Sequence, residues 1–304
     1  MSQWPCPASA SRMDQLEGIP VQIALSSQSL FALSLEEAIE ATGGAGFDAL
    51  ELACVKPHFD IDTARTRPQR VAQQIQRRGL TVAALSLFTH FTDAARLDEQ
   101  LEEAETYIRL APLFGTELLK LTPGPPGSAA ATRSHWDTLT RALQHLAGVA
   151  EKAGVRLAFE THMRQLTDSL AGTRQLLARA ASPAIGLTVD FSNLVFAGEN
   201  LAAALPAVAP RMYNTHLKNG TIGAAGSWHF DALDKGLTDY TEVLALLRGL
   251  DYRGYLTIEC LGAEARRQPV ETARRDRQIL QHLMAAGHAG ERKKNGGTER
   301  QTPD

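Results

Sequence analysis

The chain has 304 residues, of which 44% are hydrophobic and 21% charged, and its formal net charge is −3 at pH 7. This composition is typical of a globular protein, and the near-neutral charge balance disfavours nucleic acid as a partner. Three cysteines, Cys6, Cys54 and Cys260, are too few and too dispersed for a disulfide framework or a cysteine-based zinc site, so we expect them to be reduced. The sequence shows no export signal and no apolar stretch of about 18 residues, which predicts a cytoplasmic protein without a membrane segment.

From residue 21 onward, apolar runs of strand type alternate with amphipathic helical segments. The expected strands are Val21–Ser26, Ala49–Cys54, Thr81–Phe88, Glu117–Thr122, Arg156–Glu160, Gly186–Asp190, Tyr213–Leu217 and Tyr255–Glu259. The expected helices between them include Leu35–Thr42, Thr66–Arg78, Leu97–Phe114, Trp136–Ala153, Ser169–Ala180, Leu201–Val208 and Tyr240–Leu250. Strands separated by helices imply right-handed crossovers and a parallel sheet.

Such units, repeated over roughly 250 residues, have the size of a closed (β/α)8 TIM barrel, which is the fold class we predict. An open doubly wound sheet is the alternative. It is weakened by the first turn after a strand, Ser26–Ser29, which lacks the glycines that cradle a pyrophosphate. No linker divides the pattern, so we predict one barrel domain over residues 19–288, a flexible leader over 1–18 and a disordered, polar, glycine-rich tail over 289–304.

Four consecutive predicted strands end in a side chain that can bind a metal. The first ends in Glu160, and the next three supply Asp190, His216 and Glu259. Functional groups of a TIM barrel come from the C-terminal ends of several strands, so we expect these four to converge. Three carboxylates and one imidazole suit Mn²⁺, Mg²⁺ or Co²⁺, with Zn²⁺ a less natural ion. One such residue alone would more often be a helix cap or a surface group.

The order and spacing of these motifs resemble the signature of the xylose isomerase-like TIM barrels, the sugar phosphate isomerase/epimerase superfamily. The motifs that carry the resemblance are Phe159–His162, Val189–Asp190, His216–Lys218 and Ile258–Glu259. The resemblance covers about residues 21–284 and implies that the four strand-end residues bind one divalent metal, often Mn²⁺. It also implies that Glu160 and Glu259 form the acid/base pair.

Such a site suits an α-hydroxy ketone, because a Lewis acid stabilises the enediolate that forms when a carbon-bound proton leaves. Two carboxylates on opposite faces can remove and return that proton. Return to the other face gives an epimer, return at the neighbouring carbon gives an isomer, and loss of a β-hydroxyl gives a dehydrated product.

Several neighbouring residues are candidate substrate contacts. His162 and Lys218 each lie two residues beyond a predicted ligand, so we expect both at the pocket mouth. His90, after the third predicted strand, is a further candidate contact. The alternative for His162 is a loop histidine that caps a helix, and the alternative for Lys218 is a solvated loop lysine.

Asn193 lies three residues after Asp190 and is also a candidate substrate contact. Several family members have a histidine at this point. Asparagine keeps the hydrogen-bonding capacity but not the titratable group, which counts against a sugar 3-epimerase.

Two more features allow two interpretations each. Glu51, inside the second predicted strand, suits a pocket role or a structural one equally well. Trp228 and His229 lie in a long loop after Leu217, which either covers the site as a lid or simply buries its own aromatic residue.

We predict a divalent-metal-dependent isomerase or epimerase acting on a sugar or a related polyol-derived α-hydroxy carbonyl compound. The nearest alternative is a lyase on the same metal site, either an inosose-type dehydratase or an enzyme that cleaves keto-glycosides. An abasic-site endonuclease would need more histidine and carboxylate ligands and a basic surface. A sugar-binding barrel without catalysis is the non-enzymatic alternative, and a homo-oligomer is compatible with the sequence.

Overall fold

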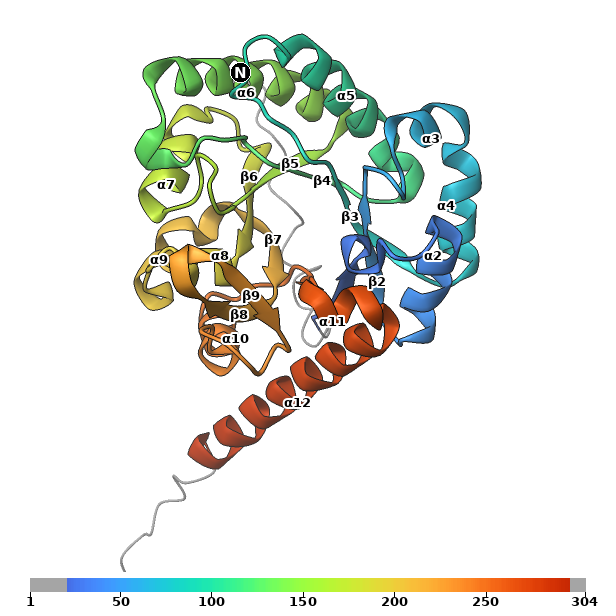
Figure 1. The fold of residues 1–304 in the computed structure, drawn as a ribbon, viewed down its shortest axis with the longest axis vertical. Helices are drawn as coiled ribbons and strands as arrows, with labels where there is room; N and C mark the ends of the chain where they lie inside the picture. The colour runs from blue at the N-terminus through green and yellow to red at the C-terminus, as the bar shows by residue number, and fades with distance from the viewer. Residues whose placement is uncertain (1–20, 296–304) are drawn as a thin grey trace, which may run out of the picture.

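The structure is a computed structural model that describes residues 21–295. Its parallel strands close into a barrel in the order β1-β10-β7-β6-β5-β4-β3-β2, and helices surround it (Figure 1). The barrel strands are β1 (Ile23–Ser26), β2 (Ala49–Ala53), β3 (Thr81–Ser86), β4 (Leu118–Leu121), β5 (Arg156–Glu160), β6 (Ile185–Asp190), β7 (Met212–Leu217) and β10 (Leu256–Ile258). The predicted (β/α)8 barrel is confirmed.

The α-helices lie on the outside of the barrel, where those before β10 connect successive strands and the last two follow β10. They are α2 (Leu35–Gly44), α3 (Ile61–Thr66), α4 (Pro68–Arg77), α5 (Leu97–Leu110), α6 (Arg133–Ala153), α7 (Leu170–Arg179), α8 (Phe191–Phe196), α9 (Leu201–Val208), α10 (Tyr240–Gly249), α11 (Gly262–Arg267) and α12 (Pro269–Asn295). The predicted helix Thr66–Arg78 was placed too early, because α3 ends at Thr66 and Pro68 opens a separate helix. Proline suits the first turn of a helix, where its missing N–H is not needed.

The two faces of each strand differ in side-chain character. Side chains that point outward are apolar and pack against the helices, as Phe159, Val189 and Ile258 do. Further towards the N-terminal ends of the strands, the interior contains small residues such as Ala49 and Ala158. Successive residues of a strand point to opposite faces. The charged residues at the strand ends therefore lie on the inner side, above a core of small side chains.

A two-stranded antiparallel hairpin follows β7, where the sequence indicated only a long loop. It consists of β8 (Asn219–Ile222) and β9 (Trp228–Asp231). Gly220 and Gly223 weaken the strand signal of this segment, and both of its strands have only four residues. The hairpin lies beside α8 and α11 at the face where the barrel strands end (Figure 1).

The C-terminal helix α12 extends away from the barrel (Figure 1). The predicted domain boundary at residue 288 falls inside this helix, which continues to Asn295. The predicted leader, residues 1–18, and the rest of the predicted tail lie outside the described residues.

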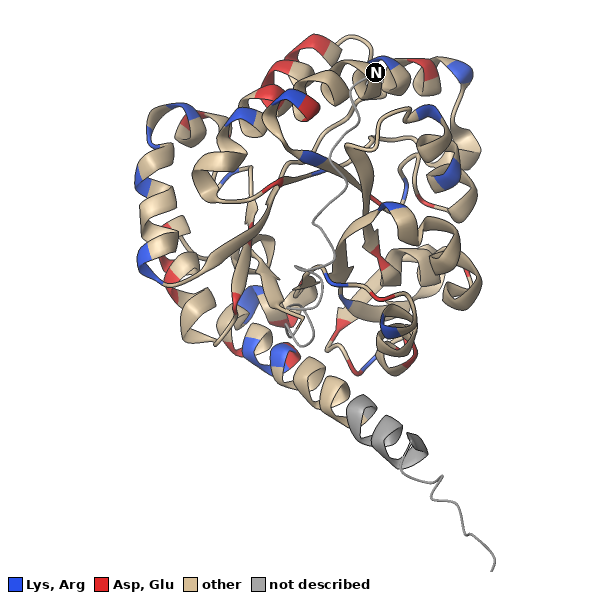
Figure 2. Ribbon diagram, turned by 180° about the vertical axis from the view of Figure 1, so that it is seen from behind, with Lys and Arg blue, Asp and Glu red and all other residues tan. Residues whose placement is uncertain are grey.

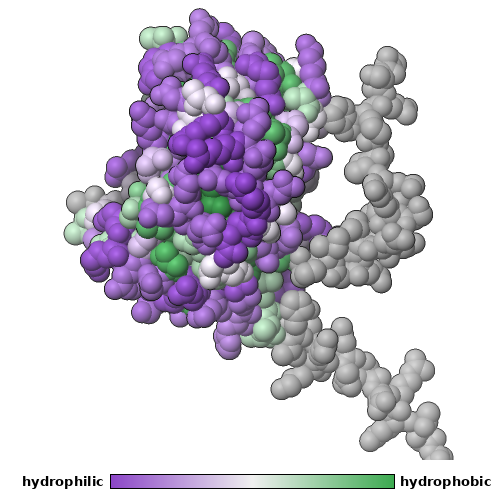
Figure 3. All heavy atoms as spheres, turned by 90° about the vertical axis from the view of Figure 1, so that its right-hand side faces the viewer, coloured by the Kyte–Doolittle hydropathy of each residue, from purple (hydrophilic) through white to green (hydrophobic). Residues whose placement is uncertain are grey.

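The outer surface is polar. Acidic and basic residues are interspersed on the outer helices in Figure 2, which is typical of solvated helix faces. The side of the molecule seen in Figure 3 is mostly hydrophilic, with a few scattered apolar side chains. Within the described residues, no helix has the length and apolar character needed to cross a membrane.

Candidate metal centre

The structure brings the four predicted metal ligands together inside one end of the barrel. Glu160 and Asp190 are the last residues of β5 and β6, His216 lies in β7, and Glu259 directly follows β10. All four are buried, and each offers one ligand atom within 4.8 Å of the others. The convergence expected from the strand ends is therefore observed.

Glu51 orients the imidazole of His216. Its carboxylate oxygens lie 2.9 Å and 3.0 Å from His216 Nε2, and Asn214 Nδ2 donates to Glu51 Oε2 at 2.8 Å. Because a carboxylate accepts hydrogen bonds, Nε2 carries the ring proton, and Nδ1 is left with its lone pair when the ring is neutral. A histidine held in this way by a carboxylate is the usual arrangement of a metal ligand.

The geometry around His216 Nδ1 fits a bound cation. Nδ1 lies 3.5 Å from Glu160 Oε1 and 3.4 Å from Glu259 Oε1, and it makes no hydrogen bond with any described residue. Buried polar atoms rarely stay unsatisfied, and carboxylate oxygens repel a lone pair. A divalent ion would satisfy all of these atoms at once, and the oxygen-rich ligand set suits Mn²⁺, Mg²⁺ or Co²⁺.

The two carboxylate oxygens of Asp190 have different roles: one caps a helix and the other faces the centre. Its Oδ1 accepts the Asn193 N–H at 2.9 Å and caps α8. Its Oδ2 lies 2.7 Å from Lys218 Nζ, without a well-directed hydrogen bond from any described residue. Asp190 therefore begins α8 through one oxygen and offers the other as a ligand.

Two buried lysines pair with the two glutamates. Lys218 Nζ lies 3.1 Å from Glu259 Oε2, and Lys120 Nζ lies 2.6 Å from Glu160 Oε2. Each glutamate thus turns Oε1 to the histidine and Oε2 to an ammonium group. Lys120 was missed in the sequence analysis, although a lysine inside the apolar run Leu118–Leu121 is itself a signal, because lysine is rarely buried without a partner.

These charges shift the protonation equilibria of the metal-free centre. Burial raises the pKa of Glu160, but Lys120 and the nearby histidines outweigh it and hold that pKa well below its ordinary value. Burial likewise raises the pKa of Glu259, yet Lys218 and His216 leave it lowered. Both glutamates are therefore carboxylates at neutral pH.

Asp190 and His216 shift in the opposite direction. Burial, together with the charges of Glu160 and Glu259, raises the pKa of Asp190. Burial disfavours the imidazolium of His216, but the carboxylates, led by Glu51, raise the pKa of this ring well above its ordinary value. The protein thus balances negative charge with its own cations when no metal is bound.

The predicted substrate contacts His162, Asn193 and His90 differ in their burial and in their hydrogen-bond partners. His162 is half-buried and its Nδ1 lies 2.8 Å from the Met163 carbonyl oxygen. Asn193 is buried, donates from Nδ2 to the Thr161 carbonyl oxygen at 2.9 Å, and has no hydrogen-bond partner for Oδ1 among the described residues. His90 is exposed, and its main-chain N–H donates to Gln100 Oε1 at 2.9 Å.

The β8–β9 hairpin contacts the segment that follows β5. The guanidinium of Arg164 lies 4.3 Å from the ring centroid of Trp228. The Phe230 ring centroid is 5.8 Å from Lys218 Nζ. Phe230 of β9 therefore lies near Lys218, whereas Trp228 of the same strand packs against Arg164.

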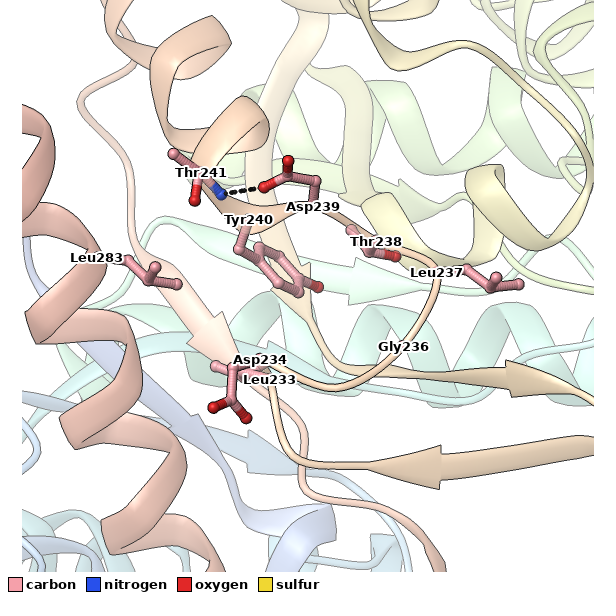
Figure 4. Close-up of a pocket in the computed structure, with 9 residues that line it drawn as sticks. All are labelled: Leu233, Asp234, Gly236, Leu237, Thr238, Asp239, Tyr240, Thr241 and Leu283. Carbon is pink, nitrogen blue, oxygen red and sulfur yellow. Dashed lines mark hydrogen bonds between the residues drawn. The ribbon is translucent and has the colours of Figure 1, made fainter.

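A separate surface pocket lies between the segment 233–241 and α12 (Figure 4). Its volume is about 290 Å³. The hydroxyl of Tyr240, which lines it, donates to the Lys218 carbonyl oxygen at 2.5 Å and accepts the Lys218 N–H at 2.9 Å. This pocket thus lies next to the main chain of Lys218, and none of the four clustered residues lines it.

Comparison with known proteins agrees with the fold. Residues 39–283 match the xylose isomerase-like TIM barrel family. An inosose dehydratase of Bacillus thuringiensis (strain Al Hakam) is 22% identical over 273 residues, covering 81% of this chain and 89% of the relative. Inosose dehydratase 1 of Bacillus cereus (strain ZK / E33L) is 25% identical over 274 residues, covering 82% and 89%.

Solved structures share the architecture. L-ribulose 3-epimerase superposes with a TM-score of 0.74 at 21% identity, covering 93% of this chain and all (100%) of that one. The IOLI protein, whose structure holds a zinc atom, gives a TM-score of 0.76 at 14% identity, covering 87% and 98%. The probable 3-DHS dehydratase AsbF of Bacillus anthracis gives 0.72 at 19% identity, covering 86% and 98%.

The chain belongs to the xylose isomerase-like TIM barrel family. With its buried Glu/Asp/His/Glu cluster, it is a metal-site barrel enzyme of the superfamily that contains sugar isomerases, epimerases and dehydratases.

Proposed function

We propose that this protein is a divalent-metal-dependent isomerase or epimerase acting on a sugar or a polyol-derived α-hydroxy ketone, with Mn²⁺ as the expected ion. The observation that supports this is the placement of Glu160 and Glu259 on two sides of His216, each with Oε1 within 3.5 Å of Nδ1. Two carboxylates that flank one point can act on opposite faces of a planar intermediate.

The residues of the centre have distinct roles in this proposal. Glu160, Asp190, His216 and Glu259 would hold the ion, which would act as a Lewis acid on the substrate carbonyl group. One glutamate takes the proton from the carbon next to the carbonyl, and the other, once it has taken up a proton from solvent, returns that proton to the opposite face. Lys120 and Lys218 keep both glutamates ionised and therefore able to accept a proton.

Substrate contacts would come from the mouth of the barrel. Lys218, His162 and Asn193 are the proposed hydrogen-bonding residues, and the unpaired Oδ1 of Asn193 offers an acceptor for a substrate hydroxyl. His90 is exposed, and it stays a proposed contact only for a substrate that reaches the outer loops.

Dehydration of an inosose-type ketone is the second candidate function. It is favoured because the curated relatives reported above are inosose dehydratases that align over 89% of their length. In that reaction a glutamate again takes the proton next to the carbonyl. The bond from the neighbouring carbon to its hydroxyl then breaks, and the hydroxyl takes up a proton and leaves as water, without any oxidation or reduction.

Metal analysis of the purified protein, followed by a substrate screen in D2O, tests the proposal. Ketoses, inososes and 3-keto-glycosides are incubated with protein loaded with Mn²⁺ and examined by NMR and mass spectrometry. Epimerisation or isomerisation introduces solvent deuterium into substrate or product without loss of water. A product that lacks water assigns the dehydratase instead, and no exchange with any compound would overturn both functions.

A further inference from the structure

Lys120 has no role in the sequence-based assignment, yet it occupies the interior of the barrel. It lies on β4, in register with Ser86 of β3 and Ala158 of β5. Its side chain is fully buried, at 0% exposure. Burying an ammonium group is costly unless partners replace its hydration, so this position requires a physical reason.

The contacts of Lys120 leave part of its hydrogen-bonding capacity unused. Glu160 Oε2 lies 2.6 Å away, and the Phe88 ring centroid lies 4.2 Å from Nζ. No described residue accepts a well-directed hydrogen bond from Nζ. An ammonium group has three N–H donors, and the register neighbours Ser86 and Ala158 are small, so an acceptor is missing on this side of the centre.

The same centre carries a second ammonium group on its other side. Lys218 contacts Glu259 and Asp190, while Lys120 contacts Glu160. The two glutamates lie between the two lysines, with His216 in the middle. A substrate that spans the two glutamates therefore meets a cationic donor at each end.

We propose that Lys120 binds the substrate, donating a hydrogen bond to an oxygen that lies outside the α-hydroxy ketone unit, on the Glu160 side. The substrate class that fits is a ketone with hydroxyl groups on both sides of its carbonyl group. The inference rests on the proposed function for the identity of the reacting unit. A ketone with oxygens on one side only would leave the Lys120 donor without a partner.

The competing interpretation is that Lys120 only neutralises Glu160. The two interpretations differ in which small molecules bind more weakly when the lysine is removed. A pure counter-ion affects every ligand of the centre alike, because it acts through Glu160. A substrate contact affects only ligands that carry the outer oxygen.

The test is a binding experiment with two probes on Lys120→Met and wild-type protein, both loaded with Mn²⁺. The first probe is a fully hydroxylated inosose, and the second is 2-hydroxycyclohexanone, which keeps the α-hydroxy ketone unit but lacks the outer hydroxyls. Because Lys120 also pairs with Glu160, its removal acts on both probes, but we expect Lys120→Met to weaken inosose binding about 10- to 100-fold more than 2-hydroxycyclohexanone binding in calorimetry. Lys152→Met, on the exposed face of α6, is the matched control and should change neither.

Equal losses for both probes, or no loss for either, would overturn the inference. A ketohexose and a 3-keto-glucoside extend the panel, and failure of wild-type protein to bind any polyhydroxylated ketone would overturn it as well. Binding is read without turnover, so a protein that binds inosose through Lys120 but exchanges no proton would refute only the proposed function. If Lys120→Met does not fold, Glu160→Gln/Lys120→Met is compared with Glu160→Gln, because removing both charges leaves no unpaired ion.

Discussion

Glu51 on β2 and His216 on β7 meet across the barrel, with Glu51 Oε1 2.9 Å from His216 Nε2. Their strands are not neighbours in the barrel order, so the contact crosses the interior. We expect Glu51→Gln to weaken Mn²⁺ binding about 10- to 100-fold, because a neutral amide no longer fixes the ring tautomer and orientation. Calorimetric titration of metal-free protein measures the change, and Glu102→Gln, on the surface of α5, is the control. Unchanged metal affinity would show that the contact does not orient the ligand.

Replacing either proposed acid/base residue should abolish turnover. We expect Glu160→Gln and Glu259→Gln to lower the rate of substrate proton exchange by at least about a thousandfold, since the amide cannot accept a proton. Each variant should keep the circular dichroism spectrum of the wild-type protein. Proton exchange is followed by NMR in D2O with protein saturated with Mn²⁺. A variant that retains most of the activity would remove that residue from the mechanism.

Lys218 should compete with the metal for its ligands. Its ammonium group lies 2.7 Å from Asp190 Oδ2 and 3.1 Å from Glu259 Oε2. Lys218→Met should therefore destabilise metal-free protein by about 3–5 kcal/mol, because buried carboxylates lose their partner. The same change should increase the rise in Tm on Mn²⁺ addition, because the ion then replaces the missing charge. Thermal unfolding with and without Mn²⁺ measures both effects, and a smaller metal-induced rise than in wild-type protein would contradict the prediction.

Metal binding should strengthen as pH rises. Without metal, the pKa of His216 lies well above its ordinary value because Glu51, Glu259 and Glu160 stabilise the imidazolium against burial. This raised pKa stabilises the metal-free fold at low pH, and that contribution is lost as pH rises through the folded-state pKa. A metal ligand must be unprotonated, so binding releases the His216 proton, and affinity should rise by up to about tenfold per pH unit below the folded-state pKa.

Calorimetry in buffers of different ionisation enthalpy counts the released protons. The matched experiment uses His282→Gln, which removes an exposed histidine on α12 and should leave the proton release unchanged. Binding that releases no proton around pH 7 would show that His216 is already neutral in the metal-free protein.

The contact between Arg164 and Trp228 should stabilise the β8–β9 hairpin locally. Arg164 has a positive φ of 60° and stacks on the indole at 4.3 Å. Trp228→Ala should increase amide hydrogen exchange in β8 and β9 by a few-fold, since such a contact at an exposed site contributes about 0.5–1 kcal/mol. Exchange in the barrel strands serves as the internal reference. Equal protection of the hairpin in both proteins would exclude the stacking as its anchor.

The sequence by itself determined the barrel and the four residues that converge at its strand ends. Alternating apolar runs and amphipathic helices specify a parallel sheet, and the polar ends of β5, β6, β7 and β10 are visible because each interrupts an apolar run. Parallel strands align their C-terminal ends, so residues such as Glu160 and Asp190 must lie near one another once the barrel closes.

Only the tertiary structure decided which other charged residues contact these four side chains. Glu51 and His216 are 165 positions apart, and their contact depends on barrel closure rather than on any local pattern. In the sequence, Lys120 is a single charged residue inside an apolar run. Only its contact with Glu160 in the folded chain makes it part of the centre. The β8–β9 hairpin likewise escaped prediction, because strands of only four residues gain their stability from packing against the barrel rather than from local propensity.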